Sequence, residues 1–160
     1  MRRASFRPVC LVAAAAFCFG ATAAMAIEET PSNLVELLKL QGRCLKVAIA
    51  RDDLTSRCSG GLAIAVYEDG RVGFHLTLHP RHILSLSGMH PRSGGGIVVL
   101  DRAIFNTGSE TNKPDILAAS GTCSYGDPYA GRMTVRCSGT LEGGKDFVAA
   151  FQTDGSPPAQ

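Results

Sequence analysis

The sequence contains no tryptophan, and its seven Phe and three Tyr side chains amount to 6% of 160 residues. Aromatic rings are the usual stacking platforms for sugars and nucleobases, so ligands of that kind lack their common contact surface here. A Cys-x-x-Cys motif is also absent, which removes the signature of a thiol-disulfide oxidoreductase. No stretch approaches the roughly 20 apolar residues of a membrane helix, and we therefore expect a soluble chain with no membrane span.

Sequence signatures of hydrolases are missing as well. The chain has neither G-x-S-x-G nor S-x-x-K, and the segment Asn106-Thr107-Gly108 lacks the aspartate of a D-T-G motif. Asp52-Asp53 and the acidic loop that follows Asn106 do not reproduce the spacing of a calcium-binding loop. These absences favour a protein that is not an enzyme.

The N-terminus has the pattern of a secretory signal peptide. Three arginines precede an apolar segment at Val9–Phe19, and the small-residue motif Ala24-Met25-Ala26 follows it. We expect residues 1–26 to be removed near Ala26, which leaves a periplasmic or secreted protein that begins at Ile27. The loss of three of the 16 basic residues leaves 13 against 14 acidic ones, a formal net charge of about −1. This near balance gives no electrostatic basis for a nucleic-acid partner.

Four cysteines remain after the signal peptide, and they belong to two copies of one template. "GRCLKVAIARDDLTSRCSGGL" from Gly42 and "GTCSYGDPYAGRMTVRCSGTL" from Gly121 agree at eight of 21 positions without a gap. In the oxidising compartments that receive exported proteins, an even number of cysteines predicts disulfides. Each pair of cysteines is 14 positions apart, which suits a hairpin, so the favoured pairing is Cys44 with Cys58 and Cys123 with Cys137. Crossed pairings that link the two copies are the alternative.

Short alternating apolar segments separated by turn residues predict an all-β fold, a small disulfide-stapled antiparallel barrel or sandwich of about eight strands. We expect a single domain at residues 27–153, with repeat copies near 42–78 and 121–152, and a flexible C-terminal tail at 154–160. The segment 33–41 is the exception. Asn33 followed by Glu36 resembles a helix N-cap, which predicts a short helical turn that leads into a strand.

The alternation also fixes the register of one hairpin. Val66 is expected opposite Val72 and Ile64 opposite Phe74, because side chains paired across two strands share a face. This leaves a three-residue loop that ends at Gly70, where a left-handed backbone is required.

All four histidines lie within residues 75–90, which makes a metal site the sharpest chemical hypothesis. His75 and His79 on one strand would be roughly 13 Å apart, too far to share a metal ion. His79 and His82, with His90 as a third ligand, are therefore the candidate ligands for zinc or copper. The alternative is a solvated polar face with no cofactor.

The segment "SGMHPRSGGG" is a candidate recognition loop, because it combines Met89, Pro91 and Arg92 with three consecutive glycines. An ordinary solvent-exposed connection is the alternative interpretation.

The expected architecture resembles small periplasmic β-proteins such as the C-type lysozyme inhibitors, which insert a loop into an enzyme cleft. Their S-G-x-x-Y pattern is not present, since the nearest segment, Ser120–Tyr125, reads "SGTCSY" and has one residue too many. We therefore expect an exported, monomeric, non-enzymatic β-domain that binds an envelope protein or ligand. A histidine-based metal-binding protein and an inhibitor of an envelope-targeting hydrolase are the alternatives.

Overall fold

The computed structural model describes residues 32–91, 96–106 and 113–160. The expected signal peptide and Arg92 lie outside these residues. The described residues belong to one compact unit, Pro31–Gln160.

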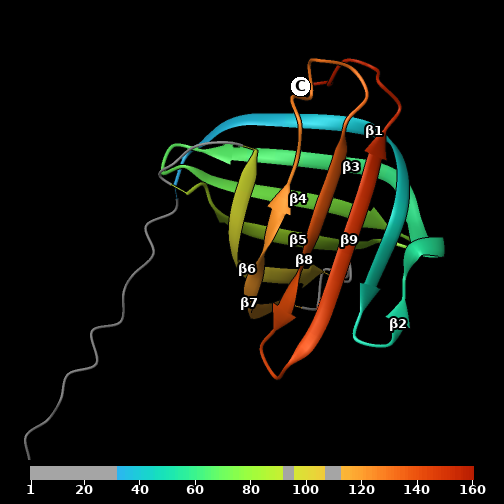
Figure 1. Cartoon of the computed structure of the whole chain (residues 1–160), viewed down its shortest axis with the longest axis vertical. Coiled ribbons are helices and arrows are strands. Elements are labelled where there is room, and N and C mark those ends of the chain that lie inside the picture. The colour runs from blue at the N-terminus through green and yellow to red at the C-terminus, as the bar shows by residue number, and fades with distance from the viewer. Residues whose placement is uncertain (1–31, 92–95, 107–112) are drawn as a thin grey trace, which may run out of the picture. The chain divides into compact units, whose positions relative to one another are not determined.

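Antiparallel strands make up nearly all of the regular structure in the described residues (Figure 1). The elements in chain order are β1 (Leu34–Ile49), β2 (Asp52–Asp53), the short 3₁₀ helix η1 (Thr55–Arg57), β3 (Cys58–Tyr67), β4 (Arg71–Leu78), β5 (His82–Met89), β6 (Ile97–Asn106), β7 (Asp115–Ser124), β8 (Thr134–Leu141) and β9 (Lys145–Thr153).

The sheet closes into a barrel because β1 pairs with two different strands. From β3 to β9 each strand pairs with the next along the chain, and the first half of β1 pairs with β3. From Gly42 onward β1 pairs with β9 instead, as its bend beside β9 in Figure 1 shows. The result is a closed antiparallel barrel of eight strands, with the two-residue β2 as an extra strand on β1. The predicted all-β barrel is therefore confirmed.

Side chains fill the barrel interior. Successive residues of a strand point to opposite faces, and the inward-facing set is apolar on every long strand. Eight strands enclose a space that side chains can just fill. The largest fully buried members are Phe74, Phe151, Ile64, Leu76, Leu78, Leu86, Val47, Val72 and Val98.

The helical turn predicted near Asn33 is wrong, because residues 34–41 belong to strand β1. Leu38 and Leu40 are 3% and 2% exposed whereas Lys39 and Gln41 between and after them are exposed, which is the two-residue period of a strand. The Asn33 side chain donates to a carboxylate oxygen of Glu68 across the sheet, at 3.0 Å. Ladder pairing and core burial outweigh the weak local signal for a helix cap.

The predicted β3–β4 hairpin is confirmed. Ile64 lies opposite Phe74 and Val66 opposite Val72. The turn residue Gly70 has φ +84°, in the left-handed region that a side chain disfavours.

The C-terminal segment, expected to be a flexible tail, contacts the first strand through its backbone. Ala159 forms an isolated bridge with Lys39, with hydrogen bonds of 2.7 and 3.0 Å in the two directions. The Asp154 backbone N–H also donates to the Gln41 carbonyl oxygen at 2.9 Å, so the C-terminal segment runs beside β1.

Candidate functional site

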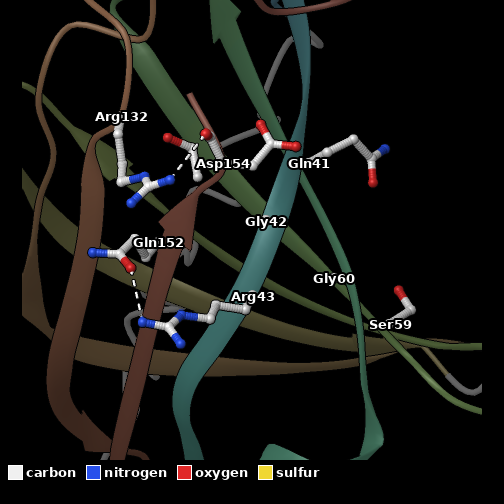
Figure 2. Close-up of a pocket in the computed structure, with 9 residues that line it drawn as sticks. Gln41, Gly42, Arg43, Ser59, Gly60, Arg132, Gln152 and Asp154 are labelled. Atoms are coloured by element: carbon white, nitrogen blue, oxygen red, sulfur yellow. Dashed lines mark hydrogen bonds between the residues drawn. The ribbon is translucent and has the colours of Figure 1, made fainter. Parts of the chain in front are cut away.

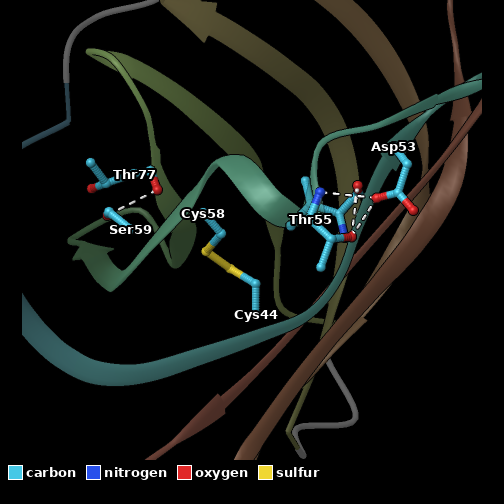
Figure 3. Close-up of a disulfide and its surroundings, with 7 residues drawn as sticks. Cys44, Asp53, Thr55, Cys58, Ser59 and Thr77 are labelled. Atoms are coloured by element: carbon cyan, nitrogen blue, oxygen red, sulfur yellow. Dashed lines mark hydrogen bonds between the residues drawn. A yellow bond between two sulfur atoms is a disulfide. The ribbon is translucent and has the colours of Figure 1, made fainter.

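Both predicted disulfides are present, and they hold different kinds of structure. Cys123 lies directly opposite Cys137 in the β7–β8 ladder, with a Cα–Cα distance of 4.0 Å. Cys44 and Cys58 are 6.1 Å apart at Cα, yet Cys44 pairs through its backbone with β9 and Cys58 with β4 (Figure 3). The first disulfide therefore spans a seam, the place where β1 has left β3. Two disulfides indicate an oxidising compartment.

Polar side chains replace part of the missing ladder beside this seam. The Thr55 hydroxyl accepts from the backbone N–H of Val47 at 2.9 Å, and the Asp53 carboxylate accepts from the Thr55 backbone N–H (Figure 3). Lys46 pairs with Asp53 and, together with Thr55, lowers the pKa of that carboxyl. In β3 the Ser59 hydroxyl donates to the Thr77 carbonyl oxygen at 3.1 Å.

The structure does not bring the three candidate metal ligands together. His79 and His82 flank the β4–β5 turn, and His90 follows the opposite end of β5. His82 stacks on Phe105, with ring centroids 5.5 Å apart. Across residues 32–91, 96–106 and 113–160 no group of three or more His, Cys, Asp and Glu side chains is placed to hold a metal ion.

The hydrogen bond between His75 and Ser85 resembles the one between a catalytic base and its nucleophile, but Ser85 is buried. Nδ1 of His75 lies 2.8 Å from the Ser85 hydroxyl, and Ser85 is 7% exposed. The imidazole lies close to Gly73, where a β-carbon would come within 2.9 Å of Nε2. Burial lowers the pKa of His75, so the neutral ring is favoured. These contacts describe a packed structural pair on the barrel exterior.

His90 anchors the start of the candidate recognition loop. One ring nitrogen lies 3.0 Å from the Ile97 carbonyl oxygen, and the other lies 2.9 Å from the Tyr125 hydroxyl. Tyr125 packs edge-on against the core residue Phe74 at 5.3 Å, and burial raises the pKa of its phenol. Pro91 is half-buried next to this anchor. The histidine thus ties the described base of the loop to the core.

Apolar side chains are exposed beside this anchor, on the outer face of β5 and β6. Ile97 and Val99 are each 49% exposed, and Val99 lies opposite Met89 across the ladder. Their neighbours Val98 and Leu100 point inward and are buried. Arg71 and Asp101 form a two-pronged ion pair at the border, with N–O distances of 2.8 and 2.9 Å. We call Met89, Ile97 and Val99 the β5–β6 surface.

A polar pocket of about 570 Å³ lies at the seam (Figure 2). Figure 2 shows Arg43, Arg132 and Gln152 on one side of β1 and Gln41 and Ser59 on the other. The complete lining consists of Gln41, Gly42, Arg43, Ser59, Gly60, Arg132, Gln152, Thr153 and Asp154.

Sequence reasoning missed this pocket, although the repeat contains a signal for it. Arg43 occupies the position that Thr122 takes in the second copy, so the two copies differ beside an otherwise shared Gly and Cys. A charged residue that occurs in only one copy stands at a position where the shared fold does not require that charge. The partner strand at this position, β9, could not be inferred from the alignment.

The chain matches no known family model, no curated protein and no solved structure. The lysozyme-inhibitor alternative therefore stays a prediction from architecture. Within the described part of the chain, no helix is long and apolar enough to cross a membrane.

Proposed function

We propose that this chain is an exported, non-enzymatic β-barrel domain that binds another protein through the β5–β6 surface. The observation that carries the proposal is the exposure of Ile97 and Val99, 49% each, beside the anchored base of the recognition loop. Apolar side chains at the centre of a patch with charged residues at its border are typical of protein interfaces. The Arg71–Asp101 pair supplies such a border.

The filled interior supports recognition on the outside of the barrel. Core side chains from all eight long strands occupy the space in which larger barrels hold a ligand. The two disulfides support export, and we propose cleavage of the signal peptide near Ala26 as the route.

Affinity capture with matched surface variants tests the proposal. Wild-type protein that begins at Ile27 is immobilised and exposed to an envelope extract of the source cells, and retained proteins are identified by mass spectrometry. Val99→Glu is expected to abolish capture of the partner, because it places a charge in the centre of the apolar surface. Ile116→Glu is the control, since Ile116 is 62% exposed on β7 and lies outside the β5–β6 surface.

Circular dichroism and thermal melting establish that both variants are folded before capture. Loss of the partner from Val99→Glu but not from Ile116→Glu supports the proposal. Equal capture by all three proteins contradicts it.

A further inference from the structure

The first repeat is open at the seam where the second repeat is closed. In the second copy Gly121 lies opposite Gly139, and Thr122 opposite Ser138, within a continuous β7–β8 ladder. The corresponding residues of the first copy line the pocket, namely Gly42, Gly60, Arg43 and Ser59. The β1–β3 ladder stops at the pair Gln41 and Gly61, because β1 then turns to β9 to close the barrel.

Two arginines at this opening have neutral partners. Nη2 of Arg43 donates to the side-chain oxygen of Gln152 at 3.1 Å, and Nη2 of Arg132 donates to the backbone oxygen of Asp154 at 3.4 Å. Among the described residues neither guanidinium forms an ion pair, whereas Arg71 pairs with Asp101. A guanidinium has five N–H donors, so each retains several for a ligand.

The one acidic side chain among the pocket-lining residues is already engaged. An Asp154 carboxylate oxygen accepts from the Ser156 backbone N–H at 2.8 Å, as part of the C-terminal turn. This hydrogen bond, with a smaller contribution from the charge of Arg132, lowers the pKa of Asp154. With two guanidinium groups and one carboxylate, the lining has a formal charge of +1.

We propose that the seam pocket is a binding site for an oxyanion, a carboxylate or a phosphate carried by a small polar ligand. Arg43 and Arg132 supply charged N–H donors, and planar guanidinium groups match the paired oxygens of such anions. Gln152, on the same side of β1 as the two arginines, offers its side-chain amide to the rest of the ligand (Figure 2). Gly42 and Gly60 line the pocket through their backbones, because a β-carbon on Gly42 would lie 2.1 Å from the Gln152 carbonyl oxygen and one on Gly60 would lie 2.8 Å from the Gly42 carbonyl oxygen. The site is separate from the β5–β6 surface and does not depend on it.

Calorimetric titration of the folded, disulfide-bonded protein tests this site. Inorganic phosphate and citrate are titrated separately at constant ionic strength maintained with chloride. We expect saturable binding of at least one of them, and loss of about tenfold or more in affinity for Arg43→Gln and for Arg132→Gln. Arg81→Gln, which removes the same charge from an exposed turn outside the pocket, is the control and should bind as the wild type does.

The two anions distinguish the chemical source of the ligand. Binding of phosphate alone or of citrate alone supports the site and identifies the group that it accepts. Thermal melting identifies any variant that has lost its fold. If Arg43→Gln is such a variant, Arg43→Lys replaces it, because lysine keeps the charge but lacks the planar guanidinium group. Absence of saturable binding of both anions, or equal weakening by Arg81→Gln, overturns the proposal.

Discussion

Cys44 is joined to Cys58 by a disulfide although the two residues share no ladder, because Cys44 pairs through its backbone with Phe151 and Cys58 with Leu78. Cys123 and Cys137, with the same sequence separation of 14, are direct ladder partners. One template therefore produces a covalent link across a seam in one copy and within a hairpin in the other.

The two disulfides should differ in what their removal does locally. Each closes a loop of similar length, so Cys44→Ser/Cys58→Ser and Cys123→Ser/Cys137→Ser should each lower the free energy of unfolding by roughly 3 kcal/mol. Only the first pair should also increase amide hydrogen exchange in its own segments, residues 42–46 and 58–60, because no ladder joins β1 to β3 at these residues. Hydrogen exchange measured by mass spectrometry under native conditions checks this. Similar local exchange in both double variants would contradict the seam.

Gly121 should not tolerate alanine. A β-carbon there would lie 2.2 Å from the Ser138 carbonyl oxygen, a backbone atom that cannot move aside. Gly121→Ala should lower the free energy of unfolding by about 1 to 3 kcal/mol, as measured by urea denaturation. Gly61→Ala is the matched control within a strand, since its nearest neighbours lie 3.8 Å away. A loss from Gly61→Ala as large as that from Gly121→Ala would refute the close approach of β7 and β8.

His75 should make stability depend on pH. Its pKa is lowered from 6.5 by burial, so between the two values the unfolded chain binds more protons than the folded one. The free energy of unfolding should therefore fall as pH drops below about 6.5, down to the lower pKa of the folded state. Asp101, whose pKa is lowered by Arg71, titrates in a more acidic range.

Melting temperature against pH measures this dependence for wild type, His75→Gln and the exposed control His79→Gln. His75→Gln should make the melting temperature less dependent on pH near and below pH 6.5. In the same range His79→Gln should keep the pH dependence of the wild type. An unchanged slope in His75→Gln would show that the ring is not desolvated.

The Tyr125 hydroxyl should stabilise the base of the candidate recognition loop. Tyr125→Phe keeps the ring against Phe74 but removes the partner of the His90 nitrogen at 2.9 Å. We expect a loss of about 0.5 to 1.5 kcal/mol in urea denaturation. Tyr129→Phe should have a smaller effect, because Tyr129 is 58% exposed and its hydroxyl bonds Glu36 in solvent. The reverse order would contradict the anchoring role of His90.

Local sequence patterns determined the register of one hairpin and favoured the disulfide pairing that the structure shows. The alternation around Ile64 and Phe74 set the β3–β4 register, because a shift by one residue would turn the apolar face to solvent. The repeat favoured the pairing of cysteines that the structure shows, because equal spacing within each copy suits closure inside the copy, but it left the crossed pairings open. The separation of His82 from His90 could also have been read from the strand between them, since β5 spans eight residues.

Only the tertiary structure decided how the barrel closes. The pairing of β1 with β9 joins segments about 100 residues apart, and no local pattern indicates that β1 exchanges β3 for β9 at Gly42. The strand at residues 34–41 also depended on tertiary pairing, because its ladder partners are residues 61–67 of β3, at least 20 positions further along the chain. The seam pocket has the same origin. Arg43 and Arg132 both line it because β1 leaves β3 to pair with β9, and that closure depends on contacts between distant residues.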